Sequence, residues 1–249
     1  MKIKKKLTRK QLLKQEDEFI STSTKILMWI KENYNKVIIG LIIIAILMIA
    51  VFSVRYSSKN TLIQSNKLLN LAKENYYAPI RPPTQTQDPT SMPQGFTSSV
   101  EKYQKSLQLF EEIMDLYPKS EAAEEARFFI PNCFYFLEEY DKALEGFEEY
   151  LDSYPNGIFA QQALIGLGYV YQKKGDYEKS IEIFQQILDN NPEYVLRDAL
   201  YMQIGLAYEE TGSMDKAREA YQNIIINFPD SPFVKEAEEK INIMEEKND

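Results

Sequence analysis

The stretch QQALIGLGYVYQKKGDYEKSIEIFQQILDNNP, residues 161–192, decides the fold. It predicts two helices joined by a turn at Gly175, because each half spaces its apolar and small residues along one helix face. Pro192 is expected to stop the second helix. The residues that carry the pattern are Leu164, Leu167, Gly168, Tyr171, Ser180, Phe184 and Ile187.

The same pattern recurs every 37 residues. A small residue on each second helix lets paired helices approach, an aromatic residue four positions later fills the space, and a proline ends the helix. Such a pair cannot bury its apolar face alone, so the pairs are expected to stack. The repeated positions are Ser106, Ala143, Ser180 and Ala217; Phe110, Phe147, Phe184 and Tyr221; Pro118, Pro155, Pro192 and Pro229; and, in first helices, Gly168, Gly205, Tyr171 and Tyr208.

The repeat resembles the tetratricopeptide repeat, with Leu164 in place of the usual tryptophan and Ser180 in place of alanine. The resemblance implies an all-α solenoid of helical hairpins. One repeat departs from the pattern, because Pro131 stands where Gly168 and Gly205 stand in later copies. A proline inside a helix predicts a kink or an early break there.

Charge divides the chain in two. Residues 1–36 hold ten basic and four acidic residues, a net of +6; since the whole chain carries −8, residues 37–249 carry −14. An acidic body of this kind argues against nucleic acid as its partner. In the basic arm, Thr8 is expected to begin a short amphipathic helix. This arm could bind anionic lipid or a cytoplasmic partner. The favoured alternative is a solvated arm that only fixes the topology.

The chemistry-bearing residues are few. The chain has no histidine and one cysteine, Cys133, which removes imidazole catalysis, internal disulfides and most zinc sites. We therefore expect no enzyme, and predict no catalytic, cofactor-binding or metal-binding residue. Cys133 is expected to be a buried small hydrophobe, with an intermolecular disulfide as the alternative.

A membrane span is predicted at residues 37–54, which contain no charged residue. A cleaved signal peptide is disfavoured because 36 residues precede the apolar stretch and no small-residue cleavage pattern follows it. The basic excess before the span places the N-terminus in the cytoplasm and the repeats outside it. The span is interpreted as an uncleaved signal anchor.

Five regions follow from these observations. After the span, Leu62, Leu69, Leu71 and Ala72 predict a stalk helix with one apolar side, and a proline-rich polar insertion comes next. A charged final helix is expected to cap the stack. The predicted regions are 1–36 basic cytoplasmic arm, 37–54 transmembrane anchor, 55–77 stalk or first repeat helix, 78–98 insertion, and 99–249 repeat domain with its capping helix.

The resemblance also implies where a partner binds. Tetratricopeptide solenoids bind extended peptides or proteins on the concave surface lined by first helices, and an apolar segment or partner helix would suit this one. For Phe128, Ile165 and Leu206, burial in the core is an equal alternative. The predicted groove residues are Phe128, Asn132, Tyr135, Gln162, Ile165, Tyr169, Met202, Leu206 and Glu209.

In its architecture the chain resembles membrane-anchored repeat proteins of the bacterial envelope. A basic tail, one span and an acidic repeat domain are similar to the ancillary subunit of the Sec translocon. The Tyr-Pro endings at Tyr117 and Tyr154 resemble the repeats of the cell-division coordinator and of the outer-membrane assembly lipoprotein. These resemblances imply a scaffold or adaptor on the outer face of the inner membrane that assists protein translocation, folding or complex assembly. The alternative is a structural or oligomerisation module of the division, wall-synthesis or outer-membrane assembly apparatus.

Overall fold

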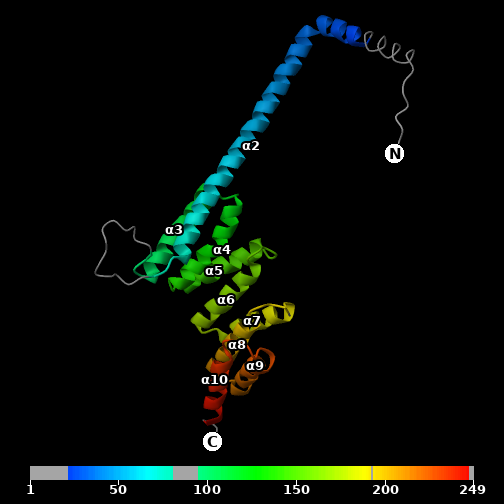
Figure 1. The fold of residues 1–249 in the computed structure, drawn as a ribbon. Coiled ribbons are helices and arrows are strands. Elements are labelled where there is room, and N and C mark those ends of the chain that lie inside the picture. Colours follow the sequence, from blue (N-terminus) through cyan, green and yellow to red (C-terminus); the bar gives the residue numbers. More distant parts are fainter. Residues whose placement is uncertain (1–21, 81–94, 192, 247–249) are drawn as a thin grey trace, which may run out of the picture. The chain divides into compact units, whose positions relative to one another are not determined.

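The computed structural model describes residues 22–80, 95–191 and 193–246. The described chain is helical apart from turns and one isolated bridge between Ile80 and Phe96, so the predicted all-α class is confirmed (Figure 1). The basic segment at 1–21, including the helix expected after Thr8, and most of the insertion lie outside the described residues. The helices are α2 (Tyr34–Tyr77), α3 (Ser99–Leu116), α4 (Glu121–Phe136), α5 (Tyr140–Ser153), α6 (Ala160–Lys174), α7 (Tyr177–Asn190), α8 (Arg197–Glu210), α9 (Met214–Asn227) and α10 (Val234–Glu246), and residues 22–32 are also helical.

The first part of α2 is long and apolar enough to cross a membrane. Its candidate span, Tyr34–Ser53, covers 20 residues with a mean hydropathy of 2.8, and none of the apolar window is buried inside the protein. The predicted span thus lies within one continuous apolar helix, and that this helix crosses a membrane stays a prediction. The chain forms two compact units, Met1–Asn60 and Thr61–Asp249, and the helix belongs to both.

The end of α2 packs as the first helix of the stack in the second unit. Its buried face is formed by Ser65, Leu69 and Ala72, which follow the spacing of one helical stripe. The sequence placed Leu62 and Leu71 on this face, but they are 45% and 47% exposed. For Leu71 the expectation was wrong because residues 69 and 71 lie about 200° apart around a helix.

Each later hairpin packs mainly on the helices next to it in the chain. Every small residue of the repeated set on the second helices is completely buried, and the four aromatic residues are at most 1% exposed. Two first-helix glycines make room for them: a Cβ at Gly168 would lie 2.4 Å from Phe184, and one at Gly205 the same distance from Tyr221. These two repeats therefore need glycine on the first helix where the aromatic ring of the second helix packs.

Helix α4 runs unbroken through Pro131, so the predicted early break is wrong. Pro131 is fully buried against α5, where a Cβ on Gly146 would meet its ring carbon at 2.9 Å. The proline costs one backbone hydrogen bond. The helix persists because its neighbours Phe129 and Cys133 are held in the core, and glycine on the facing helix leaves room for the ring.

Turns recur in register. The residues before the repeated prolines, Tyr117, Tyr154 and Phe228, end second helices with φ of −134°, −134° and −135°. A residue before proline is disfavoured in the helical region, which explains the stop. Between first and second helices, Glu138, Gly175 and Gly212 all have positive φ, at 63°, 80° and 73°. Pro192 itself lies outside the described residues.

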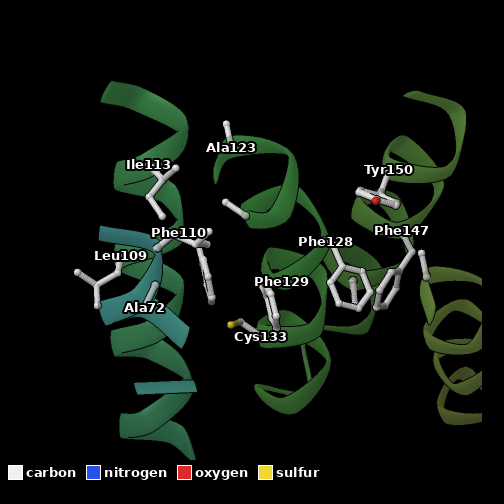
Figure 2. Packing of buried hydrophobic residues seen from close by; sticks show 14 of the residues in the cluster. Ala72, Leu109, Phe110, Ile113, Ala123, Phe128, Phe129, Cys133, Phe147 and Tyr150 are labelled. Atoms are coloured by element: carbon white, nitrogen blue, oxygen red, sulfur yellow. The ribbon is translucent and has the colours of Figure 1, made fainter. Parts of the chain in front are cut away.

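Aromatic rings fill the core between α3, α4 and α5 (Figure 2). Phe110 and Phe129 stack with ring centroids 5.0 Å apart, and Tyr76 from α2 meets Phe129 edge-on at 5.1 Å. Cys133 projects into this core, and burial raises the pKa of its thiol to about 12. The thiol therefore packs as a small hydrophobe.

Helix α10 packs on α9. Ala237 and Met244 are buried, as expected of its apolar edge. In register with Tyr201, Gly205 and Tyr208 of α8, however, α10 carries the exposed polar residues Glu238, Asn242 and Glu245. An exposed polar face of this kind is typical of a capping helix, and the capping role stays a prediction.

Candidate functional site: a tyrosine row on the first helices

The structure divides the predicted groove residues into buried and accessible groups. Phe128 is 9% exposed and stacks on Phe159 at 4.6 Å, so the core alternative holds for it. Met202 is 1% exposed and also belongs to the core, which corrects its assignment to the groove. Both occupy the same repeat position as Ile165, which is only half-buried.

The Glu209 carboxylate interacts with two side chains of the same chain. Tyr221 donates a hydrogen bond to Glu209 Oε1 at 2.6 Å, and Lys240 Nζ lies 2.9 Å from Glu209 Oε2. The carboxylate thereby ties α8 to α9 and α10. Glu209 is half-buried, so its place in the groove stays a prediction beside this structural role.

The remaining predicted residues keep accessible surface. Gln162 is exposed, whereas Asn132, Tyr135, Ile165, Tyr169 and Leu206 are half-buried. Ile165 and Tyr169 pack against the core formed by α7 and α8, and Leu206 against the last core cluster. The Asn132 amide donates to the Phe128 carbonyl at 2.7 Å, which satisfies it within its own helix.

Three half-buried tyrosines form a row, here called the tyrosine row: Tyr135, Tyr169 and Tyr194. Burial raises the pKa of all three, and neighbouring phenols add to the shift: Tyr140 and then Tyr169 for Tyr135, and Tyr194 for Tyr169. The Tyr169 ring is fixed edge-on against Phe184 at 5.6 Å. The three phenols therefore stay uncharged, and each residue keeps part of its surface accessible.

Tyr194 was missed by the sequence reasoning. It lies in the loop before α8, two residues after a repeated proline. The equivalent residues in the other loops are Ser120, Gly157 and Ser231, so an aromatic side chain at this position is an exception in the repeat. That exception was the available signal.

The site offers hydrogen bonding and apolar contact. Among the residues that the structure describes, no three histidine, cysteine, aspartate or glutamate side chains are grouped as metal ligands would be. The row is flanked by Ile165 and Asn132, and its rings are held by packing. Such a surface suits recognition of an extended apolar segment.

Comparison with solved structures settles the fold. A kinesin light chain of Podosopora anserina, described as having nearly identical TPR-like repeats, matches with a TM-score of 0.50 at 12% identity, covering 68% of this chain and 76% of that chain. The chain is a tetratricopeptide-like repeat protein. Other matches to this tetratricopeptide-like chain are MamA, with a TM-score of 0.48, 19% identity and coverage of 59% and 80%, and the TPR2AB–pHSP90 complex of yeast Sti1, with 0.45, 17%, 52% and 50%.

A family profile described as YfiO, outer membrane lipoprotein, matches residues 135–247 of the tetratricopeptide-like chain. The match begins in α4 and includes the later hairpins and α10. It falls on one of the resemblances that the sequence offered, the outer-membrane lipoprotein, and not on the ancillary Sec subunit. A search of curated protein sequences gives no match.

Proposed function

We propose that this protein is a membrane-anchored, non-catalytic scaffold of the bacterial envelope that binds segments of other proteins along the tyrosine row. It acts in the assembly of envelope complexes, and the similarity to an outer membrane lipoprotein family over residues 135–247 favours outer-membrane assembly. Translocation or folding assistance, which the Sec-like architecture suggested, is the less supported role. The repeat unit lies outside the cytoplasm and the N-terminus inside it.

The observation that carries this proposal is the tyrosine row itself. Tyr135 and Tyr169 keep accessible surface although both rings pack firmly on neighbouring aromatic residues. Rigid aromatic residues with a polar end are enriched where proteins bind one another, because they bury large area at small cost in side-chain entropy. Tyrosine rings that are held in place by packing therefore favour a role in protein binding over a catalytic role.

The mode of anchoring is part of the proposal. A lipoprotein is held by a lipid on a cysteine, but Cys133 is the one cysteine of this sequence and it is buried in the repeat core. The apolar helix Tyr34–Ser53 is long enough to replace such an anchor. We infer that the repeat unit works close to the membrane in which this helix sits.

Recovery of partners from membranes tests the proposal. Tagged full-length protein is solubilised after crosslinking, and the recovered envelope proteins are compared between wild type and the pair Tyr135→Ala with Tyr169→Ala. The matched control is Tyr171→Ala on α6, because the Tyr171 ring lies on another face of the helix, under Lys179.

The proposal predicts that the variant with both Tyr135→Ala and Tyr169→Ala loses specific partners, whereas the Tyr171→Ala control keeps them. The helix content of both variants should be unchanged. If the double variant recovers the same partners as the wild type, the tyrosine row is not the binding site. Recovery of a second copy of this chain alone would favour an oligomerisation module.

A further inference from the structure

A hollow lies between α7, α8 and α9, and none of its lining residues belongs to the tyrosine row. Its volume is about 410 Å³. Its lining from α8 includes Tyr201 and Tyr208, which lie on a different face of that helix from Leu206. A space of this size accommodates one or two large side chains but encloses none fully.

One repeat position in the lining of the hollow holds a small residue. Ala220 lines it, whereas Ile183 occupies the same position one hairpin earlier and packs against two core clusters. Ala220 itself is 5% exposed, so a longer side chain there would extend into the open space. A side chain from outside can take the place that isoleucine fills in the neighbouring repeat.

One lysine beside the hollow lacks the acidic partner that its counterpart has one repeat earlier. Lys216 lies 5.4 Å above the Tyr208 ring, just as Lys179 lies 4.9 Å above Tyr171 one repeat earlier. Lys179 also has an ion pair, to Asp176 at 2.9 Å. The residue equivalent to Asp176 is Ser213, so this acidic partner is missing from the last repeat.

The acidic residues of the lining outnumber the basic ones by one. Asp189 and Glu219 line the hollow against Lys216; both carboxylates are exposed, and within the described ranges neither has an ion pair. The apolar part of the lining comes from Leu188, Ile204 and Ala220. The hollow therefore combines a small negative excess with apolar side chains.

These features point to one kind of occupant. An anionic lipid surface is disfavoured by Asp189 and Glu219 and by the acidic character of the whole unit. A protein segment with Lys or Arg beside an aromatic or aliphatic residue satisfies both the charge and the apolar space. We propose that the hollow between α7, α8 and α9 is a second docking site, which takes an apolar side chain from a basic segment of a partner protein.

The test uses full-length protein in detergent and a fluorescein-labelled peptide, Lys-Ala-Phe-Leu-Lys, blocked at both ends. Fluorescence anisotropy measures its Kd against that of the acidic peptide Glu-Ala-Phe-Leu-Glu. Ala220→Ile fills the hollow as Ile183 does one repeat earlier. Asp189→Asn with Glu219→Gln removes the charge, and the matched control Asp152→Asn with Glu182→Gln makes the same change one repeat earlier.

We expect Ala220→Ile to weaken binding of the basic peptide about tenfold, the loss of one anchor contact. The charge pair should weaken it about fivefold and flatten its salt dependence, while the control changes Kd less than about twofold. Absence of binding to wild type, equal binding of the acidic peptide, or equal effects of the charge pair and its control would overturn the proposal. If Ala220→Ile lowers helix content, the charge pair decides alone.

Discussion

Replacing Gly168 by alanine should destabilise the repeat unit, although the same change stabilises most helices. In an unconstrained helix interior, alanine is favoured over glycine by about 0.5–1 kcal/mol. Here the added Cβ would lie 2.4 Å from Phe184 Cε1, and the ring is completely buried. Because the ring has no free space to move into, we expect an overpacking cost of about 1–3 kcal/mol. The net loss should be about 0–2.5 kcal/mol.

A double-mutant cycle separates this contact from general effects. Urea unfolding followed by circular dichroism gives the free energy of unfolding of wild type, Gly168→Ala, Phe184→Leu and the double variant. The smaller leucine should make the alanine tolerable, with a coupling of about 1–2 kcal/mol. A rise in stability for Gly168→Ala, or the same loss in both backgrounds, would refute the claim that glycine is required there by the facing ring.

Three further predictions concern stability. Glu138 has φ of 63°, so Glu138→Gly should stabilise the unit by about 0.5–1 kcal/mol in thermal unfolding, whereas Gly175→Ala should destabilise it. Burial raises the pKa of Tyr76 above its ordinary 10.0, so the folded state keeps the phenol proton more tightly than the unfolded state. The stability that this provides below pH 10 should be lost as the pH rises above 10, and the loss should be less steep in Tyr76→Phe. Glu209→Gln should weaken the contact with Lys240 and cost about 1–3 kcal/mol, seen as faster hydrogen exchange in α10.

Periodic features were accessible to sequence reasoning. A constraint that recurs in every hairpin, such as the burial of Ser106 or the ring at Phe147, leaves the same residue type at each copy. The span was equally clear, because eighteen consecutive residues without charge allow few alternatives. Both signals depend on local chemistry alone.

Features that depend on a particular neighbour were not accessible. For Phe128, the groove and the core were equal alternatives. Its burial follows from stacking on Phe159, a loop residue before the next hairpin. Pro131 was expected to interrupt α4, yet Gly146 on the facing helix accommodates its ring. The inward direction of Glu209 likewise depends on Lys240, 31 residues later. No period in the sequence encodes these pairings.

The most direct test of the scaffold proposal places a photo-crosslinking residue at Gln162, an exposed position beside the tyrosine row. Glu182, exposed on α7, is the control position. After irradiation of living cells, the account predicts a discrete adduct with an envelope protein from position 162 that is lost when Tyr169→Ala is added. Equal adducts from both positions, or none from position 162 above the control, would contradict it.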